Sequence, residues 1–219
     1  MRRSSVRHGR SPDASRLTPH VCSVFKTPWG WMGTAVSETG ARAGVCRIVL
    51  PRVSRRAVEA TLYRESLGEG RKGTPSRLTP GTHCSGECNG SPSRLTILVE
   101  EARAQLIAFL EGKRRELDFP IDLSGGSAFQ RRVWRAILRI PYGRVRSYKW
   151  VALRVGGAGY ARAVGHALGA NPVPIVIPCH RVVTQDASLG GFTGGLKTKR
   201  RLLQLEGTLP QLHPRKRNG

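Results

Sequence analysis

Short apolar runs separated by turn residues dominate the first third of the chain, and this pattern predicts a small sheet. The runs VCSVF, WMGTAV and GVCRIVLP predict strands over residues 21–25, 31–36 and 44–51. The segment that follows, 54–66, places Val58 and Leu62 four residues apart, which is the spacing of one helix face. Ser54 stands before it as an expected N-cap. We therefore expect three strands and a helix in this region.

Apolar residues in the second half recur at spacings of three and four, the period of a helix. Predicted helices cover residues 96–112, 127–140, 147–155 and 160–170. Ser127 and Gln130 have the spacing of a capping box at the start of the second of these helices, and Pro141 ends it. The Gly-rich turn at 156–159 joins the last two helices, which makes them a candidate helix-turn-helix.

Composition divides the chain into zones. We expect a disordered basic tail at 1–19, a folded region at 20–66 and a flexible Gly/Ser/Pro/Thr-rich insertion at 67–95. A helix with a linker follows at 96–123, then a second folded region at 124–207 and a basic tail at 208–219. No run approaches the ~18 apolar residues of a membrane span, and the N-terminus lacks the apolar core of a secretory signal. These features predict a cytoplasmic protein, nuclear in a eukaryote, that makes no membrane contact and keeps its cysteines reduced.

The charge balance points to a polyanionic partner. The 219 residues carry 37 Lys and Arg against 14 Asp and Glu, a formal net charge of +23, which favours nucleic acid before a membrane surface. The predicted helix at 160–170 is built mostly from Ala and Gly. Such a helix either packs tightly against its own core or lets another backbone approach closely, and the helix pattern alone leaves both open. The surrounding positive charge favours contact with nucleic acid, with Arg162 as the long cation near the helix start.

Cys179 is the candidate nucleophile. A cysteine flanked by apolar residues is most often a buried structural thiol. Here, however, Pro174 and Pro178 stiffen the segment, His180 is adjacent, and the basic surroundings favour the thiolate. Because neighbours in an extended chain point to opposite faces, we expect His180 to reach Cys179 only through a turn or a bridging water.

The segment 129–207 carries the motifs IPYGRVRSY, ARAVGHALGANPVPIVIPCHRVV, LGGFTGGL and LLQLEG. These motifs resemble the O6-alkylguanine-DNA alkyltransferases, also called methylated-DNA–protein-cysteine methyltransferases, and the resemblance extends more loosely back to residue 20. It implies a two-domain α/β fold: a small β-rich N-terminal domain of ribonuclease H-like fold at 20–66, and a helical C-terminal domain with a helix-turn-helix at 124–207.

The resemblance also implies a reaction. The alkyl group on O6 of a damaged guanine in double-stranded DNA passes to Cys179 in one in-line displacement, without cofactor or metal, and the protein is consumed. His180 takes the thiol proton through a water, and Glu206 orients that histidine. Asn171 braces the turn between the recognition helix and the active-site loop, and the Tyr148 hydroxyl helps to neutralise the departing guanine.

The same resemblance implies a DNA-binding set and a substrate pocket. Arg162 fills the gap left by the flipped nucleotide, while the small face at Ala163 and Gly165, with Tyr148 beside it, lies in the minor groove. The expected pocket residues are Pro174, Val182, Phe192, Thr193 and Gly194. Phe192 stands where the family often has tyrosine, so the ring can form a wall of the pocket but makes no hydroxyl contact.

Two other functions are compatible with these residues. One is a non-catalytic protein of the same fold that binds alkylation damage, and the other is a cysteine hydrolase using Cys179 and His180. The segment HCSGEC at 83–88 has metal-like spacing, but it lies in the low-complexity insertion without further ligands, so we expect no metal site. We expect the protein to act as a monomer.

Overall fold

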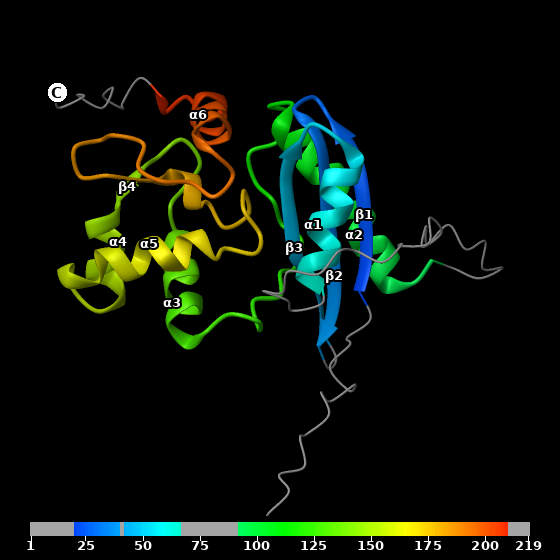
Figure 1. Cartoon of the computed structure of the whole chain (residues 1–219), viewed down its shortest axis with the longest axis horizontal. Helices are drawn as coiled ribbons and strands as arrows, with labels where there is room; N and C mark the ends of the chain where they lie inside the picture. Colours follow the sequence, from blue (N-terminus) through cyan, green and yellow to red (C-terminus); the bar gives the residue numbers. More distant parts are fainter. Residues whose placement is uncertain (1–19, 40–41, 67–91, 210–219) are drawn as a thin grey trace, which may run out of the picture.

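The structure, a computed structural model, describes residues 20–39, 42–66 and 92–209. It has two packed halves, a small sheet with two helices and a mainly helical half (Figure 1). The expected tail at 1–19, most of the expected insertion and the end of the C-terminal tail lie outside the described residues. Among the described residues, no helix combines the length and the apolar character needed to cross a bilayer.

Three antiparallel strands form the sheet in the order β1-β2-β3, namely β1 His20–Thr27, β2 Gly30–Thr39 and β3 Arg42–Arg52. The three predicted strands are confirmed, and each extends beyond its apolar run. The β1–β2 turn is tight because Gly30 adopts a φ of 125° that side chains rarely allow. The Thr27 hydroxyl donates to the Gly30 carbonyl at 2.8 Å and fixes this turn. The ribonuclease H-like relationship of the sheet stays a prediction.

Helices cover both faces of the sheet. Helix α1, Arg55–Ser66, is the predicted helix, with Ser54 accepting a hydrogen bond from the Ala57 N–H. It packs Val58 and Leu62 on one face, where they form a small cluster with Ala35 and Val49 of the sheet.

Helix α2, Arg94–Leu110, packs on the other face of the sheet. It begins two residues earlier than expected, so the predicted insertion ends too late at residue 95. The reason is Ser93, whose hydroxyl accepts the Thr96 N–H as an N-cap and allows Leu95 to become buried.

The helical half contains the other predicted helices, α3 Ala128–Ile137, α4 Tyr148–Val155 and α5 Ala161–Gly169, with a short 3-10 turn η2, Ala158–Tyr160, before the last. The capping box of Ser127 and Gln130 is confirmed in both directions. Helix α3 ends at Ile137, before the expected stop at Pro141. The sequence did not predict the last helix, α6 Leu196–Leu205, or the two-residue parallel ladder of β4 Arg146–Ser147 and β5 Val182–Val183.

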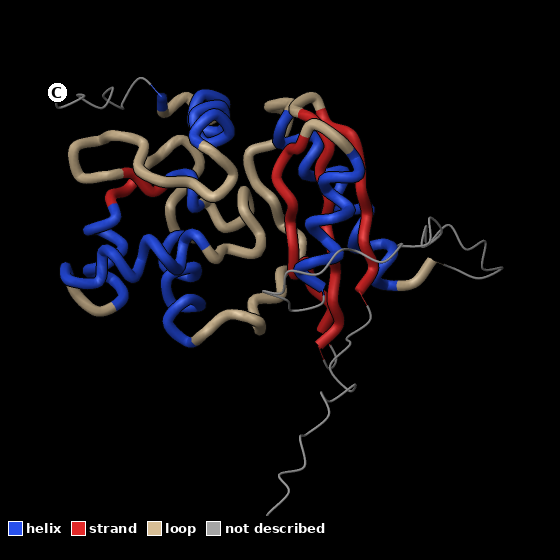
Figure 2. The backbone as a smooth tube through the Cα atoms, viewed as in Figure 1, coloured by secondary structure: helices blue, strands red, loops and turns tan. Residues whose placement is uncertain are grey.

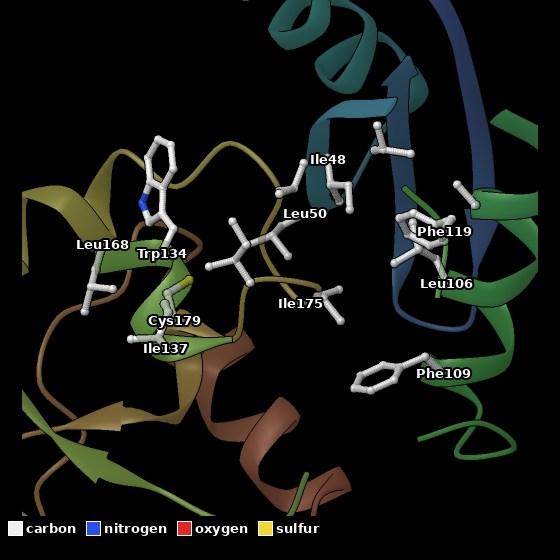
Figure 3. Close-up of a cluster of buried hydrophobic side chains, with 14 of the residues drawn as sticks. Ile48, Leu50, Leu106, Phe109, Phe119, Trp134, Ile137, Leu168, Ile175 and Cys179 are labelled. Carbon is white, nitrogen blue, oxygen red and sulfur yellow. The ribbon is translucent and has the colours of Figure 1, made fainter. Parts of the chain in front are cut away.

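One hydrophobic core runs through both halves, and loops carry the chain between them (Figure 2). The Ile48 N–H of β3 donates to the Pro172 carbonyl at 2.9 Å, which fastens the sheet edge to the loop after α5. On the helical side, Trp134 is 2% exposed and its indole N–H donates to the Ala167 carbonyl at 2.8 Å. Figure 3 labels Trp134, Cys179 and Leu168 among the buried side chains of this core. Trp134 therefore joins α3 to α5 through both packing and a hydrogen bond.

We expect Trp134→Phe to lower the free energy of unfolding by about 1–3 kcal/mol, because it leaves the buried Ala167 carbonyl without its donor. Urea denaturation followed by circular dichroism measures this change. Trp150→Phe is the matched control and should cost less than about 1 kcal/mol, since this side chain is only half-buried, lies beside Arg146 and Arg154, and keeps an aromatic ring in the variant. Equal losses in the two variants would contradict the role given to the Trp134 hydrogen bond.

Candidate active site

Cys179 opens a short 3-10 turn, η3, Cys179–Arg181, at the end of a strained loop. Ile175 has a φ of 78°, a conformation that is unfavourable for a β-branched residue, and the Ile177 N–H donates to the Val173 carbonyl at 3.0 Å. The turn replaces the extended geometry expected for this segment. The chain around Cys179 is therefore held in a fixed, tightly turned form.

Asn171 ties this loop to the sulfur. Its Nδ2 donates to the Ile177 carbonyl at 2.9 Å and to the Cys179 Sγ at 3.1 Å. Its Oδ1 accepts the Val173 N–H at 3.1 Å. One amide thus fixes the loop and the sulfur together, as expected of a residue that braces the turn.

His180 points away from the sulfur with its Nε2 and pairs with Glu206. The His180 Nε2 and the Glu206 Oε1 are 2.8 Å apart, and both side chains are fully buried. Arg181 binds the same carboxylate through its Nε at 2.9 Å and its Nη2 at 2.9 Å, and its Nη1 donates to the Ile140 carbonyl at 2.7 Å. The His180 Nδ1 is buried, and within the described part of the chain it has no hydrogen-bond partner.

The pKa shifts of this pair follow from burial and neighbouring charge. Burial alone would raise the pKa of Glu206, but hydrogen bonds and charge from His180 and Arg181 outweigh it, so its pKa lies below the usual value. Burial lowers the pKa of His180 from 6.5, and the charges of Arg181 and Lys199 add to this against the opposing effect of Glu206. At neutral pH, therefore, Glu206 is ionised and His180 is neutral.

Burial raises the pKa of Cys179 above 9.0, although the Asn171 hydrogen bond and the charge of Lys199 act in the opposite direction. The expectation that basic surroundings hold Cys179 as a thiolate is therefore wrong for the resting protein. Loss of hydration destabilises the thiolate by more than the nearby cations stabilise it. The resting sulfur is a thiol.

Lys199 of α6 is a buried cation that sequence analysis missed. It is fully buried, and its Nζ donates to the carbonyls of Val182 at 2.6 Å, Leu189 and Gly191 at 3.3 Å. Burial lowers its pKa to about 8. The Tyr148 hydroxyl donates to the same Gly191 carbonyl at 3.3 Å, so Lys199 and Tyr148 hold one loop between them.

Arg181 was also missed as a site residue. Both cations had been counted only as part of the positive charge. A signal for Lys199 does exist in the sequence, because it lies three and four residues before Leu202 and Leu203 and so falls on the apolar face of its helix. A signal for Arg181 is its position directly after the Cys-His pair.

Two cavities reach the sulfur, although Cys179 is only 6% exposed. The larger, of about 810 Å³, runs along α5 and is lined by expected site residues. These are Tyr148, Arg162, Gly165, Cys179, Phe192 and Thr193. The smaller, of about 250 Å³, adds Asn171, Pro174 and Gly194 to that set.

Four expected residues line neither cavity, and two of them are His180 and Glu206, the buried pair described above. Val182 is fully buried and offers its carbonyl to Lys199, while Ala163 is half-buried on α5. The aromatic ring of Phe192 forms a wall of both cavities, as expected for a ring without a hydroxyl. Among the described residues, no group of three or more His, Cys, Asp or Glu side chains could hold a metal ion, and the 83–88 segment lies outside them.

The sequence matches known proteins over this region. Residues 128–208 match the family model described as "6-O-methylguanine DNA methyltransferase, DNA binding domain". A methylated-DNA–protein-cysteine methyltransferase of Mycolicibacterium paratuberculosis is 53% identical over 102 residues, 47% of this chain, and this chain spans 61% of that relative's length. One of Mycobacterium leprae is 48% identical over 120 residues, covering 52% of this chain and 72% of that protein.

Solved structures agree with this relationship. The crystal structure of Mycobacterium tuberculosis O6-methylguanine methyltransferase is 30% identical, with a TM-score of 0.57 over 90% of this chain and 97% of that one. A structure of the Mycobacterium tuberculosis protein in complex with DNA is 33% identical, with a TM-score of 0.57 over 86% of this chain and 93% of that one. The identity to the Mycobacterium leprae protein over most of its length shows that this chain belongs to the methylated-DNA–protein-cysteine methyltransferase family.

Proposed function

We propose that this protein repairs DNA by transferring the alkyl group from O6-alkylguanine in a duplex to Cys179, once per molecule. The observation that carries the proposal is the position of the sulfur: Cys179 lines the cavity that runs along the small-residue helix α5 to Arg162. A nucleobase turned out of a duplex at α5 would meet the thiol there. The names of the relatives and the DNA complex of the Mycobacterium tuberculosis protein support this function.

The first step is proton removal from the thiol. Because the ionised Glu206 accepts a hydrogen bond from the His180 Nε2, the imidazole proton lies on that nitrogen and Nδ1 keeps a free lone pair. The imidazole ring is therefore in the tautomer that leaves the buried Nδ1 able to accept a proton, as a general base must. We infer that it takes the Cys179 proton through one water.

The second step is displacement. The thiolate sulfur attacks the alkyl carbon in line with O6, the carbon–sulfur bond forms, and the carbon–oxygen bond breaks with its electron pair left on guanine. The Tyr148 hydroxyl borders the same cavity, and burial raises its pKa, so it keeps a proton to share with the departing base. The product is a stable thioether, and no group in the site regenerates the thiol.

Ionising the thiol contributes only part of the rate. At an ordinary pKa of about 8.5, roughly 3% of a cysteine is thiolate at pH 7, so full ionisation gains at most ~30-fold, or roughly 2 kcal/mol. Alignment of the alkyl carbon and stabilisation of the leaving base must supply the rest. This is why the loop held by Lys199 and Tyr148 is part of the proposed machinery.

We infer that α4 and α5 form the DNA-binding helix-turn-helix and that α5 enters the minor groove. Gly165 and the half-buried Ala163 leave the α5 surface low, so a nucleic-acid backbone can approach. Arg162 is exposed at the cavity and is the side chain proposed to fill the gap in the base stack. We propose that one chain acts alone on each lesion, wherever the cell keeps its genomic DNA: the cytoplasm, or the nucleus of a eukaryote.

The transfer itself is the first test. After incubation with a duplex containing O6-methylguanine, intact-mass spectrometry should show a gain of one methyl group, mapped to the peptide that holds Cys179. Cys179→Ala should show none, and the matched Cys22→Ala variant, at an exposed cysteine, should gain it as wild type does. Binding of damaged DNA without any mass gain would favour the non-catalytic reading, and repeated turnover on an ester or amide would favour a hydrolase.

Arg162→Ala should slow repair of duplex DNA by roughly tenfold or more while changing the reaction with free O6-benzylguanine little, because the free base needs no extrusion. Single-turnover rates on the two substrates measure the difference. Arg56→Ala removes the same charge from an exposed position on helix α1, so it is the matched control and should leave both rates nearly unchanged. Equal slowing of Arg162→Ala on both substrates would rule out a role in flipping.

The transfer rate should depend on the protonation of His180. Because its pKa is lowered from 6.5, His180 stays neutral down to that pH, so the acid limb of the rate on free O6-benzylguanine should begin only below pH 6.5. His180→Gln should be slow and lack this acid limb. A histidine that is buried and neutral in the folded state makes the protein less stable as pH falls below 6.5. Circular dichroism must therefore confirm that the protein is folded at each pH. A rate that begins to fall well above pH 6.5 would contradict this assignment.

A further inference from the structure

Cys179 lies where the two cavities meet. Six residues line both cavities, namely Leu168, Gly169, Ala170, Cys179, Phe192 and Thr193. From the sulfur, the larger cavity extends along α5 to Arg162, on the proposed DNA side. The smaller is also lined by residues of β3, the edge strand of the sheet half.

The lining of the smaller cavity changes along its length. Apolar side chains of the helical half, Leu168 and Pro174, lie at the end that holds the sulfur. At the β3 and α1 end the lining combines apolar residues, Ile48, Val49 and Leu50, with polar or cationic ones, Arg47, Arg52 and Thr61. Among the described residues that line this cavity there is no Asp or Glu, and its cationic side chains are Arg47 and Arg52.

We propose that this smaller cavity receives the substituent carried by O6, and that it favours substituents ending in a carboxylate over neutral ones of the same shape. This inference rests on the proposed transfer function and adds a substrate class to it. Part of its lining comes from β3 and α1, outside the segment 128–208 that matches the family model.

In-line geometry is the first argument. During displacement the sulfur, the alkyl carbon and O6 lie on one line, so whatever else the carbon carries must project sideways at the level of the sulfur. The larger cavity is then occupied by the base, and the smaller one is the space that remains. A cavity of about 150 Å³ holds a benzene molecule, so about 250 Å³ accommodates a benzyl group with a further small substituent.

Charge is the second argument. A carboxylate is ionised and arginine is cationic at neutral pH, so a substituent with an acidic end gains attraction at the Arg47 and Arg52 end. Arg52 is exposed and Arg47 half-buried, which means that water and salt weaken the attraction. The preference should therefore be modest, about threefold to tenfold, and it should shrink at high salt. The chemistry is unchanged: the carbon–sulfur bond forms, the carbon–O6 bond breaks, and the carboxylate takes no part.

The test uses two free bases of nearly equal shape, O6-(4-carboxybenzyl)guanine and O6-(4-carbamoylbenzyl)guanine. Single-turnover rates of Cys179 modification, followed by intact mass, should be about threefold to tenfold faster for the carboxylate in wild type. In the Arg47→Gln/Arg52→Gln double variant the ratio should fall close to one. Arg42→Gln, at the exposed start of β3 and outside the cavity, should keep the wild-type ratio.

Taking the ratio within each variant removes effects on folding or on general reactivity. A wild-type ratio of one or less overturns the inference, as does a ratio that the double variant leaves unchanged. Failure with both benzyl compounds while O6-methylguanine in a duplex is repaired also overturns it, and leaves the proposed function intact. Failure on duplex O6-methylguanine as well would count against the proposed function itself.

Discussion

Glu206 accepts hydrogen bonds from separate segments of the chain, and the geometry of the site depends on this one buried carboxylate. It caps the C-terminal end of α6, accepts from His180 and Arg181 in the turn that follows the nucleophile, and receives the Gly143 N–H at 3.3 Å. A buried charge is tolerable only when it is paired and fully hydrogen-bonded. Arg181 neutralises it, so His180 can remain neutral and keep its Nδ1 lone pair. The ion pair of Glu206 and Arg181 thus sets the tautomer of His180.

The raised pKa of Cys179 has a chemical consequence. A thiol with a raised pKa is little ionised at neutral pH and is therefore protected from indiscriminate oxidation and alkylation, because both follow thiolate character. The thiolate, once formed, is also more nucleophilic than one from an acidic thiol, since nucleophilicity falls with pKa. For the single transfer that we propose, selectivity at rest and nucleophilicity of the thiolate both favour a buried thiol. Lys199, whose ammonium is held by carbonyl oxygens, offers a nearby positive charge when that anion forms.

Local patterns in the sequence predicted most of the secondary structure, whereas the missed features of the site depend on long-range contacts. The Ser127–Gln130 capping box and the four-residue spacing of Val58 and Leu62 depend on neighbours only, and both are confirmed. The protonation of Cys179 depends on how completely the folded chain excludes water, which periodicity cannot reveal. The partners of Arg181 and Lys199 are likewise backbone and side-chain groups brought together by folding. The family motifs located the nucleophile, whereas its cavities required the relative placement of the sheet and α5.

That placement is what gives the sheet half a role in the chemistry. The Ile48 N–H bond to the Pro172 carbonyl holds the edge of β3 against the loop that carries Cys179. A Cβ at Gly194 would come within 2.3 Å of the Leu50 side chain and 2.7 Å of the Phe192 ring, so alanine at 194 would require these side chains to move. A glycine at this position lets β3 form one wall of the smaller cavity. Side chains of the strand can then change which substituents reach the sulfur while the base, the histidine and the carboxylate keep their positions.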